Sequence, residues 1–306
     1  MHTISRTRNL ALGAALMLGA PACSVHQYAV DKIGDALAGT GSSFARDDDL
    51  DLVRDAAPFG LKLMESVLSE SPSHRELLLA LARGFTQYSY AYVQVDAEML
   101  EVEDMARAEA LKLRARRLFL RAKSYGLRGL DAAHAGFSKR LARNSPAAVR
   151  AADKYDVALL YWTAAAWGAA IALSKDVPES VADQPLVEAL IDRALALDER
   201  FDRGAIHTFL ISYEMSRIGG SGDSEARARR QFDRAVELSR GLSPAPFVAL
   251  AESVCVQDQR RDEFEALLQR ALSIDADADA DHRLDTLVYQ RRARWLLGRK
   301  SELFLE

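Results

Sequence analysis

A chain of 306 residues, 49% of them hydrophobic, is long enough to bury a large core. Its 40 basic and 44 acidic residues are intermixed at a net charge of −4, which excludes a basic patch of the kind that binds nucleic acid. Only 8 Pro occur, and alternating β-branched runs are almost absent, so the composition excludes a β-sheet fold and predicts an all-α protein.

The first residues are typical of an export signal. Two Arg residues precede a short apolar segment at 10–19, and small residues at 20–22 come directly before Cys23. This pattern predicts a signal peptide over residues 1–22. A Cys in this place is typical of a bacterial lipobox, so we expect lipidation of Cys23. Ala20 stands where a lipobox more often has Leu, and cleavage by ordinary signal peptidase is the alternative. Ser24 favours the outer membrane over the inner in a Gram-negative host.

The cysteine count agrees with an anchor. Cys23 and Cys255 are the only two cysteines, so lipidation of the first leaves no internal disulfide. Cys255 lies in an apolar run, where we expect a small buried hydrophobe. Residues 23–49 contain Gly, Ser and Asp clusters, and we expect a lipid-anchored arm or linker there, with a short helix at 28–37.

From residue 50 to 306 the chain repeats a helix-turn-helix unit. The clearest copies begin at Arg193, Arg234 and Arg270, at spacings of 41 and 36 residues. A tetratricopeptide repeat takes about 34 residues, so the pattern predicts stacked tetratricopeptide-like hairpins, an α-solenoid. The expected pairs are 59–70 with 75–100, 106–130 with 156–175, 186–197 with 204–218, 225–239 with 247–257, and 263–274 with 282–297. The last helix should expose a polar outer side, which Arg291, Arg292 and Arg294 fit.

The expected helix at 156–175 is central to the arrangement. It carries no charge between Val157 and Ser174, and its apolar residues lie on every side. A helix that is apolar all round is buried all round. Its length is near the roughly 20 residues that cross a bilayer. Ala contributes little hydrophobic drive and amphipathic helices continue on both sides, so we favour a buried helix of a soluble protein.

Catalytic and metal motifs are missing from the sequence. His74, His134, His207 and His282 lie far apart, and no spacing typical of a zinc site, nucleophile elbow or phosphate loop occurs. We therefore expect no enzymatic activity, no metal and no cofactor. The acidic runs at 47–49 and 275–281 lack the pattern of a calcium loop, and solvated turns are favoured there.

Aromatic and polar residues gather on the second helices of successive hairpins. In repeats of this type such helices can face each other across a groove or pore, and a pocket walled by them would suit a mostly apolar ligand with one or two polar groups. The alternative is that the rings fill the core and satisfy their own OH and NH groups, and for His207 a structural role is favoured. Tyr90 flanks the first group. The candidate residues are Gln87, Tyr88, Tyr92, Tyr161, Trp162, Trp167, His207, Tyr213 and Glu214.

Several motifs carry a family resemblance. They are the acidic stretch before LVR at 52–54, FTQY at 85–88, LYWTAAAW at 160–167, and GAIH at 204–207 followed by Tyr213 and Glu214. Over residues 25–297 the chain resembles the TatT family, lipoproteins associated with tripartite ATP-independent periplasmic (TRAP) transporters. The central helix is the most specific part of the resemblance.

The resemblance implies a periplasmic, lipid-anchored protein that assembles as a homotrimer. It implies a pore or cavity through each protomer, association with the substrate-binding protein of the transporter, and transfer of a small hydrophobic ligand. The candidate residues lie on the matching segments. The competing hypothesis is an envelope scaffold that binds protein segments in an open concave groove.

Overall fold

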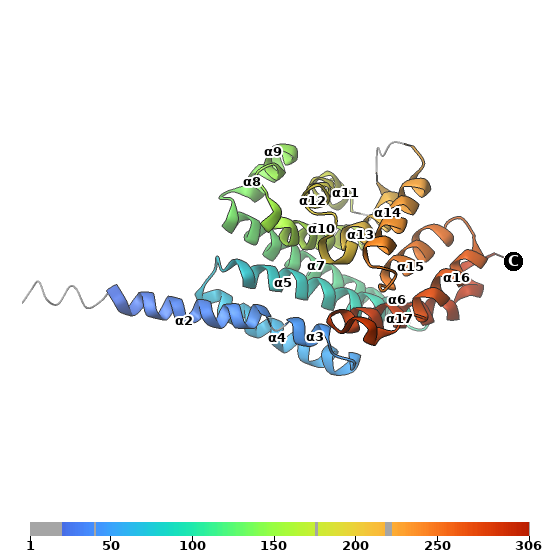
Figure 1. Cartoon of the computed structure of the whole chain (residues 1–306), viewed down its shortest axis with the longest axis horizontal. Coiled ribbons are helices and arrows are strands. Elements are labelled where there is room, and N and C mark those ends of the chain that lie inside the picture. Colours follow the sequence, from blue (N-terminus) through green and yellow to red (C-terminus); the bar gives the residue numbers. More distant parts are fainter. Residues whose placement is uncertain (1–19, 40, 175–176, 218–221, 306) are drawn as a thin grey trace, which may run out of the picture.

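The computed structural model describes residues 20–39, 41–174, 177–217 and 222–305, and within these ranges every regular element is a helix (Figure 1). The predicted all-α fold of stacked hairpins is therefore confirmed. Residues 1–19 of the predicted signal peptide lie outside the described residues, and so does the side chain of Cys23.

The first hairpin is preceded by α2 (Ala20–Gly39) and α3 (Gly41–Ala45). Its first helix, α4 (Leu50–Glu70), begins earlier than the predicted start at residue 59. The Asp49 side chain accepts hydrogen bonds from the backbone N–H groups of Asp51 and Leu52 at 3.0 and 2.9 Å, which fixes the helix start. Pro58 is accommodated inside the helix, so our later start was wrong.

The partner of α4 is a continuous rod of three elements, as predicted for residues 75–100. It consists of α5 (Arg75–Tyr88), the π-helical turn η1 (Ser89–Gln94) and α6 (Val95–Leu100). A π-helical turn widens the helix by one residue and is frequent at functional sites. Here it lies where the aromatic residues of the first hairpin are concentrated.

The remaining predicted hairpins are also present. The second joins α7 (Met105–Ala133) to α10 (Val157–Ala172) through α8 (Phe137–Arg143), α9 (Ser145–Val149) and η2 (Lys154–Asp156). After α11 (Pro178–Val181), the third joins α12 (Gln184–Leu197) to α13 (Ala205–Ser216) through η3 (Phe201–Gly204). The fourth is α14 (Ser224–Leu238) with α15 (Ala245–Leu250) and η4 (Ala251–Cys255). The last is α16 (Arg261–Leu272) with α17 (Arg283–Gly298), joined by η5 (Ala276–His282) and followed by α18 (Lys300–Leu303).

Glycines allow the close crossing of α7 and α10. A Cβ on Gly126 would lie 2.1 Å from Thr163 Oγ1, and a Cβ on Gly129 would lie 2.5 Å from a methyl group of Leu159. Leu159 and Thr163 are buried at this crossing. Cys255 is fully buried as predicted, and burial raises the pKa of its thiol to about 12.

The central helix α10 is not buried on every side. Ala158, Tyr161, Ala165 and Gly168 form a strip at helical spacing that keeps accessible surface, while Leu160 and Ala164 are fully buried. The prediction of burial all round was therefore wrong for this strip. None of the described helices combines the length and apolarity that crossing a bilayer requires.

The last hairpin meets the first, so the stack closes on itself. Helix α17 packs against α3 and α4 and lies beside α6 (Figure 1). Arg291 on α17 forms an ion pair with Asp96 on α6, and Arg292 is buried between carboxylates. Our prediction that both arginines lie on a polar outer side was wrong, because acidic residues of the first hairpin bind them. Arg294 is exposed as predicted.

Candidate ligand-binding interior

One face of α17 points toward the inner side of this closed ring. Asp285, Tyr289 and Arg292 follow each other at helical spacing along it. The Tyr289 ring lies 5.9 Å from that of Tyr90 on η1. Glu252 on η4 is bound to Arg292. The last hairpin thereby brings residues of the first and fourth hairpins together.

Three tyrosines border the interior from three different helices. Burial raises the pKa of Tyr90, Tyr161 and Tyr289 above the ordinary value, yet each side chain keeps accessible surface. All three side chains are therefore partly buried. Burial is the largest cause of each raised pKa, and the charge of Asp285 is a further cause for all three tyrosines. The four groups therefore lie in one region.

The region has an acidic end beside η3 and η5. Burial, followed by the charge of Asp202, raises the pKa of Asp285 from 3.8 to about 6, while Arg203 and His282 lower it. His282 Nε2 lies 2.9 Å from Asp202, and Arg203 is 2.6 Å from Asp279. Asp202 and Arg203 adopt left-handed φ values of 44° and 55°, which costs about 1 kcal/mol or more per non-glycine residue. Their neighbours therefore hold this turn in place.

The opposite end contains a buried cation between two carboxylates. Arg292 lies 2.5 Å from both Glu252 and Glu98, and its guanidinium stacks 4.4 Å from the Trp295 ring centroid. Burial raises the pKa of Glu252, and Arg292 opposes the shift. Tyr90 and Glu252 are each the second residue of a π-helical turn, η1 and η4 respectively. Both turns therefore direct one side chain toward α17.

Of the predicted candidates, Tyr161 lies in this interior. Its ring packs 5.3 Å from Phe201 and 4.9 Å from Trp162, which is buried. Trp167 is buried too, donates from Nε1 to Asp183 at 3.2 Å, and has the Lys123 ammonium 3.3 Å from its ring centroid. Trp162 and Trp167 thus have well-packed positions in the core.

The tyrosines of the first hairpin have cationic neighbours. The rings of Tyr88 and Tyr92 lie 5.7 Å apart, and the Arg54 guanidinium is 5.3 Å from the Tyr92 ring. Among the described residues, no hydrogen-bond partner reaches the buried Tyr92 hydroxyl, and burial raises its pKa to about 12. Arg114 lies over Tyr88, and Gln87 is exposed.

Tyr213 and Glu214 of the third hairpin have partners outside the candidate set. The Tyr213 hydroxyl lies 3.3 Å from Glu188, and the buried Glu214 pairs with Arg227 at 2.7 Å and Arg217 at 3.3 Å. The nine candidates therefore do not gather at one place, and their role in ligand binding stays a prediction. The sequence analysis missed Asp285, Tyr289 and Glu252. The helical spacing of the α17 residues was visible, but we read that helix as an end cap.

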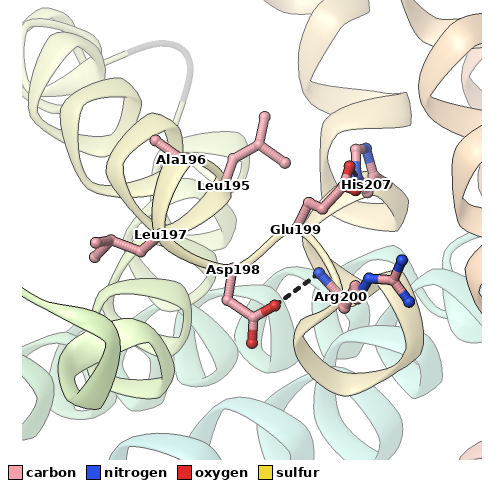
Figure 2. Close-up of a pocket in the computed structure, with 7 residues that line it drawn as sticks. All are labelled: Leu195, Ala196, Leu197, Asp198, Glu199, Arg200 and His207. Carbon is pink, nitrogen blue, oxygen red and sulfur yellow. Dashed lines mark hydrogen bonds and ion pairs between the residues drawn. The ribbon is translucent and has the colours of Figure 1, made fainter.

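His207 lies at a separate pocket of about 480 Å³ on the turn after α12 (Figure 2). The backbone N–H of Arg200 donates to Asp198 there at 3.0 Å. His207 is buried, with Nδ1 2.6 Å from Gln231 and Nε2 3.6 Å from Glu199. Among the described residues, no hydrogen bond reaches Nε2. The hydrogen bond of Nδ1 with Gln231 supports the structural role that was favoured for this histidine.

A group of potential metal ligands also escaped the sequence analysis. Ligand atoms of Asp35, His74 and Glu76 all lie within 4.8 Å of one another. His74 Nδ1 accepts a hydrogen bond from the backbone N–H of Leu77 at 3.3 Å, which leaves Nε2 to donate to the Asp31 carbonyl at 3.0 Å. Both ring nitrogens thus form hydrogen bonds with backbone groups. His74 caps the start of α5 and connects it to α2.

These features define a class of all-α protein in which tetratricopeptide-like hairpins stack so that the last hairpin contacts the first. Residues 46–304 match the family described as TRAP transporter T-component, and the chain belongs to this family. It is an accessory component of a TRAP transporter. The chain is also 28% identical over 270 residues to an uncharacterized protein of Treponema pallidum (strain Nichols), covering 86% of this chain and 83% of that protein. The family match confirms the resemblance drawn from the motifs.

Proposed function

We propose that this protein is a periplasmic, lipid-anchored carrier that binds a small, mostly apolar ligand inside its ring and docks on the substrate-binding protein of a TRAP transporter. Membership of the T-component family supports the transporter association. The ligand part depends on one observation, the set of Tyr90, Tyr161 and Tyr289. Their side chains are desolvated by the surrounding protein and yet keep accessible surface.

The chemistry of the walls suits an apolar guest. Tyrosine rings offer a large apolar face with a polar tip. Ala165 on the accessible strip of α10 presents only a methyl group one turn after Tyr161, whereas the Phe209 ring packs 3.3 Å from the Cβ position of Gly168. A mostly apolar surface with few polar groups is the usual lining of a small-molecule site.

The scaffold hypothesis needs an open concave groove. The contacts of Arg291 with Asp96 and of Arg292 with Glu98 join the last hairpin to the first, so the two ends of the stack are not open to each other. An extended protein segment entering such a groove would have to separate these ion pairs. The closure therefore supports a carrier over a scaffold.

Association of copies has a candidate surface. Leu52, Phe59 and Leu63 are exposed along one face of α4, with Phe59 74% exposed. Large exposed apolar groups at helical spacing are typical of an interaction surface. Their presence supports the proposed homotrimer. Analytical ultracentrifugation checks this, because Phe59→Glu should yield monomers if the face joins copies, whereas an unchanged assembly contradicts it.

The carrier proposal is tested by native mass spectrometry of the protein purified without detergent. We expect an additional small-molecule mass, and we expect its occupancy to fall several-fold in Tyr161→Leu. Tyr155→Leu is the matched control, because Tyr155 is 72% exposed and lies two residues before α10 begins. Absence of any bound mass, together with no binding of added apolar compounds, would contradict the carrier role.

The partner is tested separately with the purified substrate-binding protein encoded with the same transporter. A complex by size-exclusion chromatography and by pull-down from periplasmic extract supports docking. If the two proteins elute apart at micromolar concentration, with and without the bound small molecule, docking is wrong.

A further inference from the structure

One face of helix α7 concentrates positive charge in a chain whose net charge is negative. The helix contains eight basic and only two acidic residues, whereas the whole chain has a net charge of −4. Five of its arginines are exposed at spacings of three, four and seven residues, which places them on one side of the helix. This arginine stripe consists of Arg107, Arg114, Arg117, Arg121 and Arg128. Basic and acidic residues are therefore intermixed over the chain as a whole but not on this face.

Aromatic rings support three of the guanidinium groups. The guanidinium carbons of Arg114, Arg121 and Arg128 lie 5.9, 4.9 and 5.5 Å from the centroid of a neighbouring ring. These rings belong to Tyr88, Phe85 and Tyr125, respectively. A guanidinium that stacks on a ring loses less freedom when a partner binds, and the N–H groups at its edge remain able to donate. The stripe is thus held ready for acceptor groups.

The chain itself neutralises little of this charge. Arg121 pairs with Glu65, and Arg128 donates to a backbone carbonyl at 2.8 Å. No hydrogen bond or ion pair joins the side chain of Arg107 or Arg117 to a residue that the structure describes. The stripe therefore keeps a positive charge and unused N–H donors, and both are complementary to carboxylates.

The surroundings of the stripe are those of a protein interface. A surface hollow of about 410 Å³ adjoins it at Arg128, and Lys123, Leu120 and Leu127 contribute to the lining. Leu113 lies beside the stripe and is 52% exposed. Arginines that alternate with exposed apolar groups and a hollow for a partner side chain are typical of protein–protein contacts. This composition favours a folded protein with an acidic surface as the occupant.

We propose that the arginine stripe of α7 is the surface on which the substrate-binding protein docks, and that the docking face of that protein is acidic. The inference rests on the proposed docking function. It adds the place where the partner binds and the charge that the partner carries there.

A second copy of this chain is a poorer occupant. Three aspartates of the acidic run at 275–281 are each paired with an arginine of the same chain. In the run at 47–49, two carboxylates accept backbone N–H groups of their own segment. A copy that used these carboxylates to bind the stripe would have to break contacts that already satisfy them.

A membrane surface is disfavoured by the direction of the stripe. Arg128 donates to the carbonyl of Pro72, and the adjacent Ser71 donates to Asp31 of α2 at 2.8 Å. Helix α2 leaves the body at this end (Figure 1). From there the stripe continues along α7 for about 30 Å to Arg107. A bilayer that holds the start of α2 would therefore meet the Arg128 end before the rest of the stripe.

Biolayer interferometry between the mature protein and the purified substrate-binding protein tests the proposal at low and high salt. Arg107→Glu combined with Arg117→Glu reverses two charges that have no partner within the described chain, so folding should be unaffected. We expect Kd at low salt to rise at least about tenfold and the salt dependence of binding to weaken. The matched control is Arg230→Glu combined with Arg294→Glu, two exposed arginines on α14 and α17. It makes the same change in net charge and should alter Kd by less than about twofold.

Equal weakening by the two double variants, or an undiminished complex with the stripe variant, would overturn the stripe as the docking surface and leave docking itself standing. Failure of the wild-type proteins to bind at either salt concentration would overturn docking and this inference together. Flotation with vesicles of phosphatidylglycerol and phosphatidylethanolamine tests the membrane. Vesicle binding that is lost only in the stripe variant, while the protein complex persists, would assign the stripe to lipid and overturn the proposal.

Discussion

Arg291 on α17 forms an ion pair with Asp96 on α6, although 195 residues separate them in the chain. Arg54 on α4 binds the same carboxylate at 2.6 Å. One acidic side chain therefore joins both helices of the first hairpin to α17 of the last hairpin. A linear stack of repeats has no such contact, since each unit touches only its neighbours. The carboxylate makes the ends of this stack mutually dependent.

Removal of the Asp96 carboxylate should destabilise the whole ring. In Asp96→Ala, Arg54 and Arg291 lose their shared acceptor while remaining partly buried. We expect the free energy of unfolding to fall by about 2–4 kcal/mol, measured by chemical denaturation with circular dichroism. Glu103→Ala, at an exposed position in the following turn, is the control and should change it by less than about 0.5 kcal/mol. Equal effects of the two substitutions would show that the shared pair does not stabilise the closure.

The buried pair of Glu252 and Arg292 should show strong coupling. Arg292→Met removes the cation between Glu252 and Glu98 and leaves two carboxylates unmatched, so we expect a loss of about 3–5 kcal/mol. The double variant with Glu252→Gln removes one of those charges and should recover part of the loss. A double-mutant cycle from denaturation curves measures this coupling. Simple additivity of the two single changes would rule it out.

Asp285→Asn should change the pH dependence of stability in a defined direction. The carboxyl pKa is raised from 3.8 to about 6, so between these values the folded chain binds more protons than the unfolded chain. Stability contributed by the protonated form is therefore present below pH 4 and is lost as the pH rises through 6. The groups that face Asp285 are Asp202, Arg203, His282 and the interior tyrosines.

Asn carries no titrating proton, so the substitution should raise stability at pH 7.5 by about 1–3 kcal/mol and have little effect at pH 4. Thermal unfolding of both proteins at the two pH values measures the difference. Asp233→Asn provides the control, since it removes an exposed carboxylate on α14. A gain of the same size at pH 4 and pH 7.5 would exclude titration of Asp285 as the cause.

The crossing of α7 and α10 should not accept a methyl group. In Gly126→Ala the new Cβ would lie 2.1 Å from Thr163 Oγ1 and 3.3 Å from its Cα, so the helices must move apart. We expect a destabilisation of about 1–3 kcal/mol by thermal unfolding. Gly298→Ala is the matched control, because nothing lies within 4 Å of its Cβ position. Its stability should stay equal or rise slightly, and a similar loss in both variants would contradict the packing argument.

Local patterns were sufficient to predict the hairpins. The Arg-Ala pattern at 193, 234 and 270 and the uncharged segment at 156–175 identified helices that the structure confirms. The early start of α4 was missed, because a proline normally marks a helix boundary and Pro58 is here inside the helix. The preceding Asp49 was the signal that gives the correct start.

Contacts between the ends of the chain were not predictable from one sequence. Arg291 and Arg292 have the composition of a solvated end helix, and only the curvature of the stack brings them to Asp96 and Glu98. The same curvature explains Tyr161, which lies on an apolar helix and keeps accessible surface. Curvature is a sum of small rotations between neighbouring hairpins, and local propensity does not encode it.

Helix α2 extends from the body of the protein and includes Cys23 in its backbone (Figure 1). Asp31 on α2 contacts the body, because its backbone carbonyl accepts a hydrogen bond from His74. At 1.5 Å per residue, the helix between these positions spans about 12 Å. With an acyl chain on Cys23, this rigid helix would fix the distance between the protein body and the bilayer. It would also limit the tilt of the body relative to the membrane. A docking protein would then have to approach at a fixed distance from the membrane. A flexible tether would instead let the protein body sample a wide range of distances.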